Sequence, residues 1–115
     1  MTDDELAADL GPVYDRQGQR ITIAEYRALQ ADPAYRVVAV DREGSRRVST
    51  IWTGTDLSPC GVGLSLETMV FDDERREVIG GGDRYATDAE AIEGHARACR
   101  EHLGREPISA SEGPS

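Results

Sequence analysis

The amino-acid sequence predicts a single α+β domain. In it, a three- to four-stranded antiparallel sheet packs on one face against a C-terminal helix and is preceded by a short N-terminal hairpin plus helix. The length of 115 residues suits one domain. Runs rich in β-branched residues alternate with short polar turns, some with glycine, a pattern typical of hairpins. The last regular segment repeats apolar residues every three or four positions, which indicates an amphipathic helix.

The predicted domain occupies residues 13–104. Residues 1–12 are acidic, and residues 105–115 are mostly small, polar, proline or glycine residues. Neither end offers enough apolar surface to compensate for the entropy lost on ordering. We therefore expect both ends to be disordered.

The N-terminal part of the domain begins with a predicted hairpin between residues 13–15 and 20–22, with a glycine in its turn. A helix follows at once, because Thr22 and Glu25 have the spacing of a capping box. Pro33 is expected to end this helix, since proline cannot continue an α-helical hydrogen-bond pattern.

The predicted sheet is formed by four further segments, residues 35–41, 47–53, 64–71 and 76–79. They are rich in β-branched and aromatic residues and are bounded by polar or glycine-containing connections. Glycine weakens a strand interior, so we expect Gly80-Gly81-Gly82 to break the sheet and to serve as a flexible connector.

The C-terminal helix is predicted from its cap and its apolar stripe. Thr87 and Glu90 have the spacing of a second capping box, and Gly104 is expected to end the helix. The positions predicted to face the sheet share one side of the helix: Ile92, Ala96, Cys99 and Leu103.

Composition excludes several classes of function. The chain has 13 basic and 22 acidic residues, a net charge of −9, so it lacks the excess of cations that binding to a nucleic-acid backbone requires. No apolar run approaches the roughly 20 residues of a membrane-spanning helix, and the acidic N-terminus is unlike a signal peptide. Two cysteines do not form a disulfide framework. We expect a cytoplasmic protein that binds neither nucleic acid nor membrane. The absence of lysine and asparagine indicates a high-GC genome.

Three polar residues are candidates for chemistry: Asp56, Glu67 and His95. Asp56 follows a strand, Glu67 lies within the third strand of the sheet, and His95 lies one turn from the apolar stripe of the helix. Together they could act as the acid, base and orienting group of a small hydrolase-like enzyme, or as metal ligands. Alternatively, Asp56 caps a turn, Glu67 faces solvent and His95 lies at the helix edge. This alternative is favoured because no sequence spacing links the three residues.

A zinc site is a separate hypothesis. His95, Cys99 and His102 follow one another at i, i+4 and i+7, and Cys60 could add a ligand from the long loop. Structural zinc takes four ligands, commonly from close cysteine or histidine pairs, and the chain has no Cys-x-x-Cys pair. Cys99 is already explained as a core residue. We therefore expect no metal ion and no cofactor.

Four segments share the pattern of one group of proteins: Ser49-Thr50-Ile51-Trp52 leading to Gly54-Thr55-Asp56, then Glu67-Thr68-Met69-Val70-Phe71, Arg84-Tyr85-Ala86-Thr87 and Gly94-His95. Over about residues 13 to 103 the chain resembles a family of small uncharacterised proteins encoded by phages and prophages of high-GC bacteria. The resemblance implies no activity. It does favour a set of residues for binding: Trp52, Asp56, Glu67, Tyr85 and His95.

These observations favour a phage- or prophage-type accessory protein that binds another protein in the cytoplasm of the bacterial host cell, for example to modulate a host system. No complete catalytic set is evident, and an acidic chain is compatible with protein recognition. Two alternatives stay open: an enzyme that uses Asp56, Glu67 and His95, and a minor virion or assembly component. An open edge of the sheet also permits a homodimer.

Overall fold

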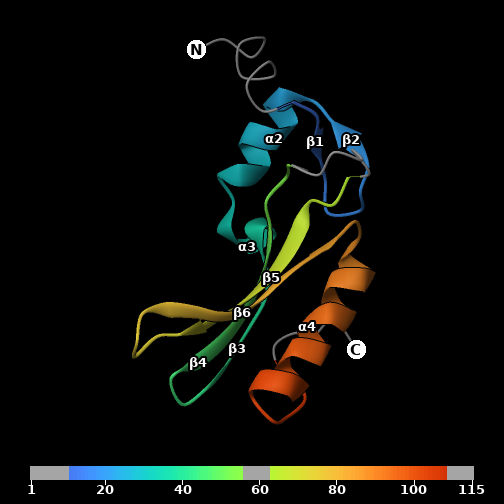
Figure 1. Ribbon diagram of the computed structural model, residues 1–115. Coiled ribbons are helices and arrows are strands. Elements are labelled where there is room, and N and C mark those ends of the chain that lie inside the picture. The colour runs from blue at the N-terminus through green and yellow to red at the C-terminus, as the bar shows by residue number, and fades with distance from the viewer. Residues whose placement is uncertain (1–10, 56–62, 109–115) are drawn as a thin grey trace.

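In the computed structural model, the described residues are 11–55 and 63–108, and their architecture confirms the predicted α+β class. A hairpin and two short helices lie at one end of a four-stranded sheet, and a long helix packs against one face (Figure 1). None of the described helices is long and apolar enough to cross a membrane. The elements, in order, are β1 (Val13–Tyr14), β2 (Arg20–Ile21), α2 (Ile23–Gln30), α3 (Pro33–Arg36), β3 (Val37–Glu43), β4 (Arg46–Trp52), β5 (Leu66–Asp72), β6 (Glu77–Tyr85) and α4 (Asp88–His102).

The predicted hairpin and first helix are both present. Strands β1 and β2 pair antiparallel, and the turn between them contains Gly18 with a φ of +79°. Helix α2 begins with the predicted capping box. The backbone N–H of Glu25 donates to Thr22 Oγ1 at 3.1 Å, and the Glu25 carboxylate accepts from the backbone N–H of Thr22 at 3.0 Å. These bonds form between residues three positions apart, which is why the sequence alone predicts them.

Pro33 does more than end α2. It occupies the first turn of α3, where proline loses no hydrogen bond, and Asp32 caps this helix by accepting from the backbone N–H of Ala34 at 3.1 Å. Residues 35 and 36 are therefore helical, and the prediction that the first sheet strand begins at residue 35 is wrong. Strand β3 begins at Val37.

The main sheet has the strand order β3-β4-β5-β6, with every neighbouring pair antiparallel. The prediction that Gly80-Gly81-Gly82 breaks the sheet is wrong, because β6 continues through the triplet to Tyr85. Two register shifts against β5 absorb Ile79 and Gly82 as extra residues. Glycine permits this course, since Gly81 and Gly82 have φ values of +92° and +95°, which side chains disfavour.

Replacing Gly81 with alanine should destabilise the fold more than the same change at Gly82. The positive φ costs about 1–3 kcal/mol at either position. A Cβ on Gly81 would also lie 2.6 Å from the backbone oxygen of Thr68, whereas nothing lies within 4 Å of a Cβ on Gly82. Urea unfolding followed by circular dichroism measures both losses. Equal losses would contradict the close approach of β6 to β5.

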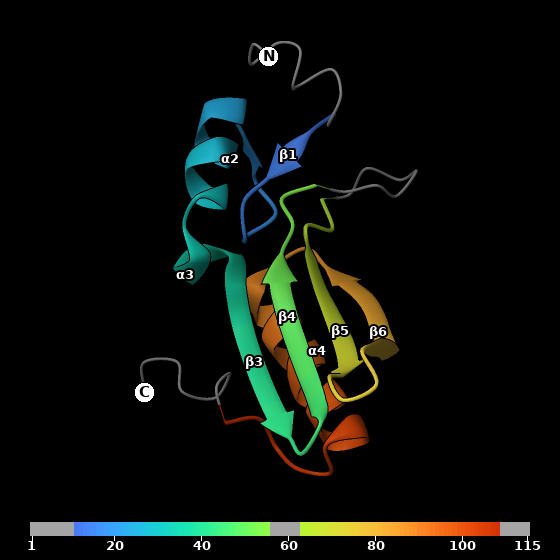
Figure 2. The ribbon, with the colours of Figure 1, turned by 90° about the vertical axis from the view of Figure 1, so that its left-hand side faces the viewer.

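Helix α4 lies behind the sheet in Figure 2, and Thr87 is its N-cap, as predicted. Of the predicted capping box, the bond from the Glu90 backbone N–H to Thr87 Oγ1 is present, while the Glu90 carboxylate accepts from the Thr87 hydroxyl. The predicted apolar stripe is wrong at Ile92, which is 40% exposed. A Cβ on Gly94 would overlap the Tyr85 hydroxyl, so the missing side chain allows α4 to approach β6 closely at this point. Cys99 and Leu103 of the predicted stripe are buried, as expected. Towards the start of α4, the buried residues lie beside the predicted positions: Ala91, Gly94 and His95.

The core between α4 and the sheet consists of two apolar clusters, Val48, Val70, Cys99 and Leu103 in one and Trp52, Leu66, Tyr85 and Ala91 in the other. Buried polar residues separate them: Thr50 lies between Val48 and Trp52 on β4, and Thr68 lies between Leu66 and Val70 on β5. We call the four buried side chains Asp41, Thr50, Thr68 and His95 the polar layer.

Residues 105–108 fold back onto this layer. The backbone N–H of Ile108 donates to Asp41 Oδ1 at 2.7 Å, and Arg105 Nη1 lies 3.4 Å from the same oxygen. Residues 105–108 belong to the tail that is predicted to be disordered. For these residues the prediction is wrong, because hydrogen bonds hold them against β3. The rest of that tail, residues 109–115, lies outside the described residues, as do residues 1–10.

Candidate functional site

The structure does not bring the three predicted catalytic candidates into one site. His95 is fully buried between α4 and the sheet, so it does not lie at the helix edge. Thr68 faces His95 from β5, and successive residues of a strand point to opposite faces. Glu67 therefore faces away from α4, where it pairs with Arg84 at 3.4 Å. Asp56 lies outside the described residues, as does Cys60.

Trp52 and Tyr85, predicted as binding residues, lie in the core and are 1% and 7% exposed. The Trp52 indole donates from Nε1 to the backbone oxygen of Tyr14 at 2.9 Å, and its ring meets that of Tyr35 edge-on with centroids 4.9 Å apart. The Tyr85 hydroxyl is buried and has no hydrogen-bond partner among the described residues. Both rings pack within the domain and leave little surface for contact with a partner.

The polar layer is a continuous chain of hydrogen bonds. Asp41 Oδ2 lies 2.8 Å from His95 Nε2, His95 Nδ1 lies 2.7 Å from Thr50 Oγ1, and Thr50 Oγ1 lies 2.6 Å from Thr68 Oγ1. A carboxylate only accepts, so Nε2 carries the proton that faces Asp41. In the neutral ring, Nδ1 then accepts from Thr50, which accepts from Thr68. Every polar side chain of the layer is thus satisfied.

Asp41 is held from the opposite side by the returning chain. Its Oδ1 accepts from the Ile108 backbone and faces the Arg105 guanidinium. Arg105 is itself positioned by donating to the backbone oxygen of Arg42 at 2.6 Å. A buried carboxylate is costly unless it is paired and hydrogen-bonded, and these contacts offset that cost.

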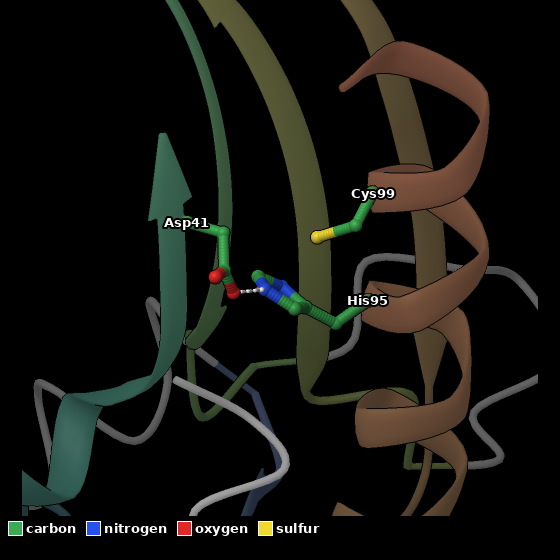
Figure 3. A group of neighbouring side chains, drawn as sticks. All are labelled: Asp41, His95 and Cys99. Atoms are coloured by element: carbon green, nitrogen blue, oxygen red, sulfur yellow. Dashed lines mark hydrogen bonds and ion pairs between the residues drawn. The ribbon is translucent and has the colours of Figure 1, made fainter. Parts of the chain in front are cut away.

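Cys99 completes a group of three potential metal ligands with Asp41 and His95. Their carboxylate oxygen, ring nitrogen and sulfur atoms all lie within 4.8 Å of one another, and Figure 3 shows them converging from β3 and α4. His95 and Cys99 share a helix face because they are four residues apart. Burial raises the pKa of the Cys99 thiol to about 11, and the charge of Asp41 adds to the rise.

His95 and Cys99 are candidates from the sequence alone, whereas Asp41 is not among the predicted site residues. A signal was present: Asp41 directly follows the apolar run of residues 37–40, two positions after Ala39, and so shares its face of the strand. An acid on the core-facing side of a strand needs a buried partner. Which partner it meets depends on the docking of α4, which no local pattern specifies.

The face of the sheet turned away from α4 is covered by no described element, and it faces the viewer in Figure 2. Strand register and alternation define this open face by these residues: Val37, Val40, Arg42, Arg47, Ser49, Ile51, Glu67, Met69, Phe71, Val78 and Arg84. Val37 and Val78 are 43% and 54% exposed. Six of its eleven members are apolar, so it is a more apolar surface than a strand face that meets only water needs.

One end of the open face is shaped by an arginine cluster. The Arg47 guanidinium lies over the Phe71 ring, 4.2 Å from its centroid. Asp73 pairs with Arg47 at 3.0 Å and with Arg42 at 2.9 Å. The hydrogen bond from Arg47 holds the pKa of Asp73 below its usual range. Beside Arg47 and Phe71 is a pocket of about 310 Å³, which Val78 also lines.

Comparisons with known proteins assign no family. No protein-family model matches the chain, and no solved structure matches it. The chain is similar to a phosphoglucosamine mutase of Chromohalobacter salexigens, with 33% identity over 92 residues, which is 78% of this chain and 20% of the enzyme. It thus spans about a fifth of the length of that curated relative. The resemblance to a phage protein family stays a prediction.

Proposed function

We propose that this chain is a small accessory protein of phage or prophage type that acts by binding another protein, and that the open face of its sheet is the binding surface. The observation that carries the proposal is the uncovered apolar surface of β3–β6. Contiguous exposed apolar residues bordered by polar ones mark interaction sites on soluble domains. The pocket beside Phe71 offers a place for a side chain of the partner.

The charges of the open face indicate the chemistry of the partner. They comprise three arginines, Arg42, Arg47 and Arg84, and one acid, Glu67. With Asp73, which pairs with two of the arginines at the edge of the face, the excess is one positive charge, although the whole chain has a net charge of −9. Arginine and aromatic side chains also contribute strongly to binding at interface centres. We therefore expect a partner surface with an apolar centre and carboxylates at its border.

The enzymatic alternative has less support. Glu67 and His95 face opposite sides of the sheet, so an acid, a base and an orienting group drawn from them do not meet at one substrate. The phosphoglucosamine mutase to which the chain is similar is about five times as long as the part that matches, so the similarity carries no activity over to this chain.

The test compares two exposed apolar side chains on opposite sides of the molecule. Val78 lies on the open face and Ile92 on the outer side of α4, with exposures of 54% and 40%. Proteins captured from a high-GC bacterial host by the unchanged chain are purified and their dissociation constants measured. Val78→Asp should weaken binding at least tenfold, because it places a charge in the pocket beside Phe71, whereas Ile92→Asp should leave it within about threefold.

Equal effects of the two substitutions would contradict binding through the open face. Sedimentation equilibrium supplies a second readout. A concentration-dependent dimer that Val78→Asp abolishes would assign the open face to a second copy of this chain, and would overturn a different protein as its partner. Copurification with phage particles would support the virion alternative instead.

A further inference from the structure

We propose that Asp41, His95 and Cys99 form a buried binding site for a divalent transition-metal ion of the zinc type. The three side chains supply one oxygen, one nitrogen and one sulfur donor, which are the donor atoms zinc takes in proteins. All three donor atoms lie within 4.8 Å of one another (Figure 3). This site is independent of the open face, which lies on the other side of the sheet.

The oxygen and nitrogen donors require little movement, whereas the sulfur, which lies within 4.8 Å of both, must approach them to about 3.6 Å. Zinc bonds of 2.0–2.1 Å at a tetrahedral angle separate an oxygen and a nitrogen ligand by about 3.3 Å. Asp41 Oδ2 and His95 Nε2 are 2.8 Å apart, so they need to separate by only about half an ångström. The supports are rigid, since Asp41 lies in β3 and the other two ligands lie one turn apart on α4.

The hydrogen bonds around the three residues suit a metal-binding histidine. Such a histidine donates its second ring N–H to a fixed acceptor, which orients the ring. When Nε2 binds the ion, its proton moves to Nδ1, and Thr50 Oγ1 is already 2.7 Å from that atom. The chain of hydrogen bonds then reverses, with Thr50 donating to Thr68. Thr68 lines a pocket of about 380 Å³ between β6 and α4, where its own hydroxyl proton can turn.

The charges also balance with an ion present. Asp41 needs only Oδ2 for the metal, because Oδ1 is occupied by the Ile108 backbone and Arg105. The carboxylate and the Cys99 thiolate together neutralise the two charges of the ion, and the thiol proton is released on binding. Three protein ligands leave the fourth position to water.

The probe is Co²⁺, because cobalt bound to a thiolate gives a charge-transfer absorption that zinc lacks. Untagged full-length protein, stripped with a chelator, is titrated with Co²⁺ and then with Zn²⁺. We expect one Co²⁺ per chain with a sulfur charge-transfer band and visible bands of tetrahedral cobalt, all displaced by one equivalent of Zn²⁺. Binding of less than one ion per chain, or bands without sulfur character, would overturn the proposal.

Three variants locate the site. Cys99→Ser should abolish the sulfur band and weaken binding at least 100-fold, because it removes a direct ligand, whereas loss of an outer hydrogen-bond partner costs about 10- to 100-fold. Thr50→Val, which keeps the side-chain shape, should show that smaller loss. Cys60→Ser is the matched control and should keep the band unchanged. If Cys60→Ser removes the band and Cys99→Ser keeps it, the proposed ligand set is wrong.

Folding of the variants is checked independently by far-ultraviolet circular dichroism in chelator. If Cys99→Ser does not fold, the test uses Asp41→Asn, and the readout is the change in melting temperature on addition of zinc. Zinc should raise the melting temperature of the unchanged protein and have a clearly smaller effect on Asp41→Asn. Equal zinc-induced shifts in both proteins would overturn the proposal.

Discussion

His95→Ala is expected to lower the free energy of unfolding by about 3–5 kcal/mol, the cost of removing one partner from a buried pair. The substitution leaves the Asp41 carboxylate and the Thr50 hydroxyl facing a cavity in the middle of the core. Arg105 and the Ile108 backbone still hold Asp41 from the other side, so the charge is not wholly uncompensated. Urea unfolding in the presence of a chelator measures the loss without a contribution from metal.

His102→Ala is the matched control, since His102 is the other histidine of α4 and is only half-buried. We expect its effect to stay within about 1 kcal/mol, as for most changes away from buried networks. His95→Gln keeps hydrogen-bonding atoms, so its loss in the free energy of unfolding should lie between the losses of His95→Ala and His102→Ala. If His95→Ala and His102→Ala destabilise equally, the polar layer does not stabilise the fold.

The second large effect is expected for Trp52→Ala, at about 3–5 kcal/mol for deletion of a buried aromatic ring. Trp52 joins the N-terminal unit, which comprises β1, β2, α2 and α3, to the sheet. Its ring contacts Tyr26 and Tyr35, and its indole N–H donates to Tyr14. Relative to the unchanged protein, the rate of amide hydrogen exchange should rise more in α2 and α3 than in β4 and β5, because the N-terminal unit loses its main apolar contact.

Trp52→Phe separates the ring from its hydrogen bond. Phenylalanine keeps most of the aromatic contact and loses the donor to Tyr14, so we expect a smaller loss than for alanine. A loss as large as that of Trp52→Ala would indicate that the hydrogen bond, and not the packing, holds the N-terminal unit. Unchanged exchange in α2 would contradict the joining role of Trp52.

Predictions from the sequence succeed where the interaction is short in sequence. The cap of α2 links Thr22 to Glu25, and that of α4 links Thr87 to Glu90, so both follow from the identity of residues three apart. They fail where the outcome depends on a neighbour in space. Taken alone, the triplet Gly80-Gly81-Gly82 predicts the end of a strand. In the structure, β6 continues through it, because pairing with β5 accommodates the triplet through two register shifts.

The candidate site divides in the same way. His95 and Cys99 are predicted to be neighbours because they lie one helical turn apart. Asp41 joins them from 54 positions away along the chain, and only the packing of α4 on the sheet places its carboxylate against the imidazole. Glu67 shows the converse, because strand alternation turns it away from the helix that buries its neighbour Thr68.

The sequence by itself therefore determines the α+β class, the caps of the main helices and the hairpin order of the strands, because these depend on local periodicity and turn chemistry. The tertiary structure decides which residues act together. Gly94 allows α4 to approach Tyr85 closely, and in this orientation of the helix His95 is buried against Asp41 while Ile92 is exposed. A rotation of one helix on a sheet is a property of the whole interface, so no segment of the sequence encodes it alone.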